Sequence, residues 1–141
     1  MVLNSKKTAT LINDVVNLVK ANNKANQHEE DIIDLSEPGI AEKLLKQTPE
    51  EIALISYFDN LSYEDIQLLQ AIMYIGRDGK SYYFDKKDKV TSSELLQTAI
   101  DYHSGLHSGD KDAAVSHIIG KAPLDRYLTD GAEILNISLN I

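Results

Sequence analysis

The stretch between Ser62 and Gly76 constrains the fold of this chain more than any other part of the sequence. Ser62-Tyr63-Glu64-Asp65 can start a helix, because a serine hydroxyl accepts an exposed amide hydrogen bond and acids favour the positive helix end. The apolar residues that follow cover more than one face of a helix: Ile66, Leu68, Leu69, Ile72, Met73 and Ile75. We therefore expect a central helix surrounded by others, with Gly76 as its C-cap.

Similar start signals recur along the chain. Thr48-Pro49-Glu50-Glu51 and Thr91-Ser92-Ser93-Glu94 each have the pattern of a capping box, and we expect helices from there to about Asp59 and Gly105. Asp110 can cap a shorter helix that ends at Gly120, and Pro123 can begin the last one.

The N-terminal third of the chain is less regular. Apolar residues at three- and four-residue spacing predict a helix over about residues 8–21, and the polar stretch 22–31 indicates a solvated linker. A weak helix is expected over about residues 37–47.

These elements predict an all-α protein, a small orthogonal bundle of five to seven helices. Near 81–90 and 137–141 the sequence also allows a short extended segment. With 141 residues, of which 43% are hydrophobic, the chain can bury one core, so we expect a single helical domain over 1–141. In it, 1–35 would form a helix plus a polar linker and 48–136 the main bundle.

Charge and composition exclude several function classes. The net charge of −8 disfavours nucleic acid and anionic membrane surfaces as partners. The absence of cysteine excludes disulfides and thiolate chemistry and is compatible with a cytoplasmic protein. No secretion signal and no apolar stretch of membrane-spanning length are apparent, and we expect a soluble protein.

Motifs for metal or nucleotide chemistry are weak. His103 and His107 have the spacing of two ligands on one helix face, and His117 could join them, but Gly105 interrupts that helix. We favour the interpretation of these residues as surface and loop histidines, and keep His103, His107 and His117 as weak metal candidates only. Gly79-Lys80-Ser81 lacks the first glycine of a phosphate-binding loop. We expect no cofactor.

The remaining polar feature lies at the end of the central helix. Arg77 and Asp78 follow Tyr74 there, and an arginine at a helix C-terminus is favoured by the helix dipole. A capping role explains Arg77 fully, yet its planar guanidinium could also hold an anionic ligand or a carboxylate. Tyr74, Arg77 and Asp78 are therefore our candidate ligand-binding residues, and no residue is a catalytic candidate.

Residues 54–136 resemble a mainly bacterial family, the domain of unknown function 3775 family. The resemblance is carried by four segments: Phe58-Asp59-Asn60-Leu61-Ser62, Leu68-Leu69-Gln70-Ala71-Ile72-Met73-Tyr74-Ile75-Gly76-Arg77, Ile118-Ile119-Gly120 with Pro123-Leu124, and Tyr127-Leu128-Thr129-Asp130-Gly131. The family usually has tryptophan at the position of Tyr74. The resemblance implies a small helical bacterial domain and assigns no catalytic residue.

Capped amphipathic helices without a convergent catalytic set favour a non-enzymatic interaction or regulatory module. Its partner would be another protein or a second copy of this chain. The alternative is a small-molecule-binding protein, or an enzyme with a weak motif, built around Arg77 and Asp78.

Overall fold

The computed structural model describes residues 4–30, 48–85, 87–105, 110–121 and 123–140. In these ranges the chain forms six α-helices and one 3-10 turn, and no strand. The elements are α1 (Ser5–Glu30), α3 (Pro49–Asp59), α4 (Tyr63–Asp78), η1 (Lys80–Tyr82), α5 (Ser92–His103), α6 (Lys111–Ile119) and α7 (Leu124–Ile134). The predicted all-α class is confirmed.

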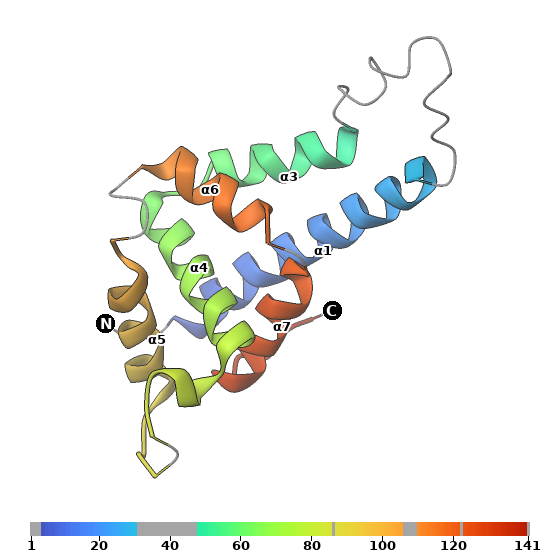
Figure 1. Cartoon of the computed structure of the whole chain (residues 1–141). Helices are drawn as coiled ribbons and strands as arrows, with labels where there is room; N and C mark the ends of the chain where they lie inside the picture. Colours follow the sequence, from blue (N-terminus) through green and yellow to red (C-terminus); the bar gives the residue numbers. More distant parts are fainter. Residues whose placement is uncertain (1–3, 31–47, 86, 106–109, 122, 141) are drawn as a thin grey trace.

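Helix α4 is the centre of the bundle. It packs against α5, α6 and α7, while α1 packs against α3 and α7 (Figure 1). Ile66, Leu69 and Ile72 of α4 are completely buried, as the apolar pattern predicted. Apolar residues of α1 belong to the same core.

Four predicted helix starts are confirmed. The side chains of Thr48, Ser62, Thr91 and Asp110 each accept a hydrogen bond from the amide of the residue three positions later, over 3.1–3.2 Å. Each cap therefore satisfies one of the amides that the first helical turn leaves without a partner in the helix.

The prediction that Gly76 caps α4 is wrong. The helix continues to Asp78, and Gly79 is the C-cap, with a φ of 83° that glycine adopts without strain. Gly76 instead lies where α7 approaches α4: a Cβ atom there would lie 1.8 Å from the carbonyl oxygen of Tyr127. Glycine is needed at this position for helix packing.

Helix α1 is longer than predicted. It continues to Glu30, so the prediction of a linker is wrong for residues 22–30. This stretch contains no glycine or proline, and its lysine, alanine and glutamine residues favour a helix. The weak helix expected over 37–47 lies outside the described residues.

Neither of the two expected extended segments contains a strand among its described residues. Residues 80–82 form the 3-10 turn η1, and residues 137–140 have no regular secondary structure. The end of the chain nevertheless docks on the bundle: Ile137 is buried, and the amide of Asn140 donates to Oδ1 of Asn13 in α1 over 3.2 Å.

No helix among the described residues combines the length and apolar character needed to cross a membrane.

Candidate functional site

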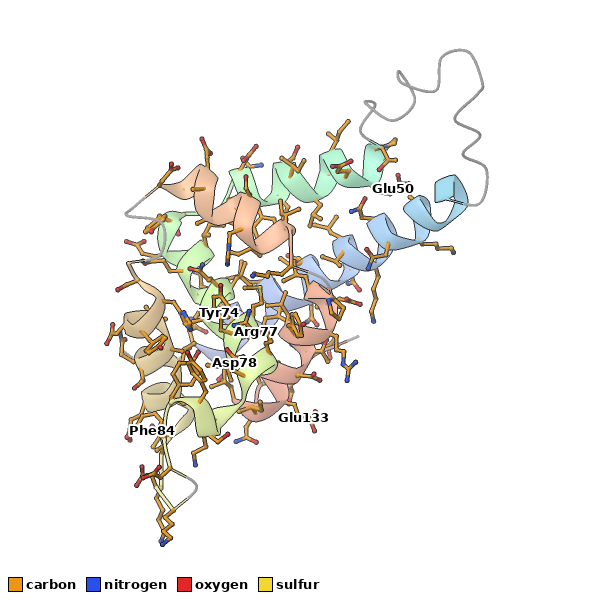
Figure 2. The ribbon with its side chains drawn as sticks, in the orientation of Figure 1. Glu50, Tyr74, Arg77, Asp78, Phe84 and Glu133 are labelled. Carbon is orange, nitrogen blue, oxygen red and sulfur yellow. The ribbon has the colours of Figure 1, made fainter. Side chains whose placement is uncertain are left out.

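Tyr74 is the centre of a polar and aromatic cluster inside the bundle (Figure 2). Its ring, 4% exposed, stacks on the imidazole of His103 from α5, with ring centroids 4.1 Å apart and planes inclined by 20°. Its hydroxyl is hydrogen-bonded to Nε2 of His117 from α6. One tyrosine of α4 thus joins both neighbouring helices. We call Tyr74, Arg77, His103 and His117 the Tyr74 cluster.

Arg77 packs over the ring of Tyr74 and binds its own neighbour in sequence. The guanidinium carbon lies 4.5 Å from the Tyr74 ring centroid, which is a cation–π geometry. Nε and one terminal nitrogen of Arg77 donate to the two carboxylate oxygens of Asp78 over 3.0 and 3.1 Å. This hydrogen bond raises the pKa of Arg77 further above its usual value. The guanidinium group that we considered for an anionic ligand therefore already binds Asp78.

Burial favours the neutral forms of Tyr74, Tyr83 and His103. Desolvation lowers the pKa of His103 from 6.5, and the positive charge of Arg77 acts in the same direction. Desolvation raises the pKa values of Tyr74 and Tyr83 above 10.0. A protonated phenol can donate its hydrogen bond to the free ring nitrogen of a neutral imidazole, so the neutral forms of Tyr83 and His103 suit the hydrogen bond between them.

Three tyrosines continue the cluster to the surface. The hydroxyl of Tyr83 is hydrogen-bonded to Nε2 of His103 over 2.7 Å, and the ring of Tyr83 is perpendicular to those of Tyr82 and Tyr102, with centroids 5.1 and 5.8 Å away. The hydroxyls of Tyr82 and Tyr102 are 3.0 Å apart. We call Tyr82, Tyr83 and Tyr102 the tyrosine patch.

The tyrosine patch is conspicuous because two of its rings face solvent. Tyr82 is 52% exposed and Tyr102 62% exposed, although they belong to η1 and α5 and are twenty positions apart in sequence. Perpendicular ring contacts are a favourable arrangement for aromatic pairs. The two exposed rings are therefore held in place by each other and by Tyr83.

The structure brings together most of the residues that the sequence singled out. Tyr74, Arg77 and Asp78 lie next to one another on α4, and His103 and His117 reach Tyr74 from α5 and α6. His107 lies outside the described residues. Within the described ranges, no three histidine, aspartate or glutamate side chains form a group suited to holding a metal ion.

The tyrosine patch was not predicted as a site. Tyr82 and Tyr83 are recognisable as an aromatic pair in sequence, but nothing local connects them with Tyr102. Only the packing of the loop after α4 on the end of α5 brings these rings together.

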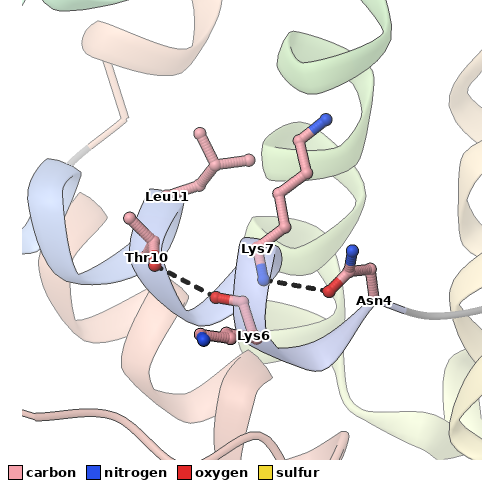
Figure 3. Close-up of a pocket in the computed structure, with 5 residues that line it drawn as sticks. All are labelled: Asn4, Lys6, Lys7, Thr10 and Leu11. Carbon is pink, nitrogen blue, oxygen red and sulfur yellow. Dashed lines mark hydrogen bonds between the residues drawn. The ribbon is translucent and has the colours of Figure 1, made fainter.

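A second polar region lies at the start of α1. Asn4, Lys6, Lys7, Thr10 and Leu11 line an open hollow there, shown in Figure 3. The amide of Lys7 donates to Oδ1 of Asn4, and the Thr10 hydroxyl donates to the carbonyl of Lys6. The ammonium of Lys7 lies 3.3 Å from Asp65 of α4. These interactions explain the region as a capped helix start tied to α4.

Comparison with known proteins found no matching family, no matching curated protein and no matching solved structure. The resemblance to the domain of unknown function 3775 family therefore stays a prediction.

Proposed function

We propose that this protein is a non-enzymatic interaction module that binds a basic segment of a partner protein through the tyrosine patch. The observation that supports this most directly is the pair of exposed rings, Tyr82 and Tyr102, held edge to face at the end of the bundle. We also propose a cytoplasmic location, with which the absence of cysteine is compatible.

Fixed and exposed tyrosines are suited to protein recognition. Tyrosine is enriched among the residues that dominate binding energy, because its large ring loses little conformational entropy and its hydroxyl still forms hydrogen bonds. The contact between Tyr82 and Tyr102 already restricts both rings before a partner arrives. Preorganisation of this kind lowers the entropy cost of binding.

Charge favours a basic partner over a second copy of this chain. Two copies would each carry a net charge of −8 and repel one another. Asp101 is exposed and is the neighbour of Tyr102 in sequence. An arginine or lysine of the partner could therefore pack on a tyrosine ring and face a carboxylate at the same time.

A small anionic ligand at Arg77 remains our second proposal. The guanidinium lies beside the buried ring of Tyr74 and is partly exposed, which suits the binding of a carboxylate or phosphate. The ligand would have to displace Asp78 from both nitrogens that it now occupies. The tyrosine patch requires no such displacement, and we therefore rank it first.

Selection from a displayed library of random linear peptides tests the main proposal. We expect enriched peptides to contain arginine or lysine and to bind the purified full chain in a salt-dependent manner. Tyr102→Ala and Tyr82→Ala should each lose this binding. Ile52→Ala is the matched control, because Ile52 is also a large exposed apolar residue, 49% exposed, but lies on α3.

Two outcomes would overturn the proposal. One is a set of enriched peptides that binds the tyrosine variants as tightly as the unchanged protein. The other is a dimer in sedimentation experiments that Tyr102→Ala dissociates, since a second copy would then occupy the patch.

A further inference from the structure

We propose that Tyr82 and Tyr102 form an oxidative coupling site, at which a one-electron oxidant joins η1 to α5 through an intramolecular dityrosine bond. This inference rests on the geometry of the tyrosine patch and is independent of the proposed partner.

The two rings meet at the edges that react. Their hydroxyls are 3.0 Å apart, their centroids are separated by 5.5 Å, and their planes are inclined by 82°. Dityrosine forms between the ring carbons ortho to the hydroxyl, and these carbons flank the carbon that carries the oxygen. A hydroxyl-to-hydroxyl contact therefore brings the reactive edges together. Both side chains are more than half exposed, so small rotations can close the remaining distance.

Two side chains that compete readily for an oxidant are absent from the chain. There is no cysteine and no tryptophan, and of the two methionines Met73 is completely buried. Tyr83 contacts both rings of the pair, but its hydroxyl is engaged by Nε2 of His103 over 2.7 Å. The hydroxyl of Tyr83 is thus directed toward His103, and no hydrogen bond joins it to the hydroxyls of Tyr82 and Tyr102 among the described residues.

The reaction removes two electrons and two protons in all. Each phenol gives one electron to the oxidant and its hydroxyl proton to solvent, and two neutral tyrosyl radicals remain. The radicals combine through one ortho carbon of each ring. Each of these carbons then loses its hydrogen as a proton while the oxygen gains one, which restores both phenols. Two equivalents of a one-electron oxidant are each reduced by one electron.

The product would act as a cross-link in a chain that has no disulfide. It would close a loop of about twenty residues, and a covalent closure of this kind stabilises the fold mainly by restricting the unfolded chain. We expect the cross-linked protein to unfold at a higher temperature than the untreated protein. Oxidation would also fix the relative position of the two exposed rings.

The experiment uses photogenerated ruthenium(III) tris(bipyridyl), with persulfate as the final electron acceptor, on the dilute full-length chain. We expect a monomeric product that is lighter by two hydrogen atoms and has dityrosine fluorescence. After proteolysis, mass spectrometry should find the peptides of Tyr82 and Tyr102 linked to each other. Tyr82→Phe and Tyr102→Phe should both abolish this product, because phenylalanine retains the ring but has no phenol to oxidise.

Tyr63→Phe is the matched control, since Tyr63 is a half-buried tyrosine of α4 outside the patch, and it should leave the yield unchanged. A second control repeats the oxidation of the unchanged chain in urea. An equal yield of the same link in urea would overturn the inference, because the folded geometry would then be irrelevant. Products linked only between molecules, or mapped to Tyr83 instead of Tyr82, would overturn it as well.

Discussion

Gly76→Ala tests how closely α4 and α7 pack. A Cβ atom at Gly76 would lie 1.8 Å from the carbonyl oxygen of Tyr127 and 2.8 Å from the amide nitrogen of Gly131. Both atoms belong to the backbone of α7, so a side-chain rotation cannot relieve the clash. To lengthen the shorter contact from 1.8 to 3.0 Å, the helices would have to part by about 1.2 Å.

The cost follows from the contacts that this displacement weakens. A gap of about 0.5–1 Å removes about a quarter to a half of the dispersion energy of a contact, and a buried leucine makes about 40–60 contacts of about 0.1–0.2 kcal/mol each. Leu124 and Leu128 of α7 are both buried. If about half of the contacts of each leucine are with α4 and lose about half of their energy, the two leucines together lose about 4 kcal/mol, and the better helix propensity of alanine offsets about 1 kcal/mol. We expect the free energy of unfolding to fall by about 3 kcal/mol.

Urea unfolding followed by circular dichroism measures this change. Gly105→Ala is the matched control, because no atom lies within 4 Å of a Cβ built there, and its effect should stay within about 1 kcal/mol. Gly131→Ala should also destabilise the protein, since its Cβ would lie 2.2 Å from the carbonyl oxygen of Ile72. A Gly76→Ala variant as stable as the unchanged protein would refute the close packing of α4 and α7.

Three further predictions concern single interactions. Thr91→Ala removes the cap of α5 and should lower the free energy of unfolding by about 1 kcal/mol, as measured by urea unfolding; an unchanged stability would contradict the cap. Tyr57→Phe removes the 2.8 Å hydrogen bond from the Tyr57 hydroxyl to Asp14, which joins α3 to α1. In the same assay the free energy of unfolding should fall by about 1–2 kcal/mol. An unchanged free energy of unfolding would show that this bond contributes nothing. Burial lowers the pKa of His103 below 6.5, so the unfolded chain binds more protons, and stability should fall as the pH decreases from 6.5 toward the folded pKa. Asp78, Arg77 and His117 also act on the pKa of this imidazole. Thermal unfolding across this range should show that the stability of His103→Gln depends less on pH than the stability of the unchanged protein. An equal pH dependence would contradict the contribution of His103.

The sequence predicted those parts of the fold that depend on neighbouring residues. Thr48, Ser62 and Thr91 cap helices as expected, because each cap is a contact between residues three positions apart. The apolar pattern of α4 likewise identified the most buried helix.

What could not be predicted depends on contacts between distant segments. Gly76 has the local pattern of a C-cap, and only the approach of α7 shows that it is a packing position. Arg77 and Asp78 are neighbours in sequence and were singled out together, but the stacking of Tyr74 on His103 depends on how α5 crosses α4. Tyr102 joins the tyrosine patch for the same reason, and its sequence neighbours contain no signal for it.

The affinity of a selected basic peptide for the unchanged protein and for Tyr102→Ala tests the central claim most directly. Isothermal titration calorimetry at one salt concentration measures both values. If Tyr102 dominates the interface, its truncation should cost about 2 kcal/mol or more, which is about a thirtyfold increase in Kd. An affinity that stays the same, while circular dichroism shows the variant to be folded, would contradict the assignment of the tyrosine patch as the binding surface.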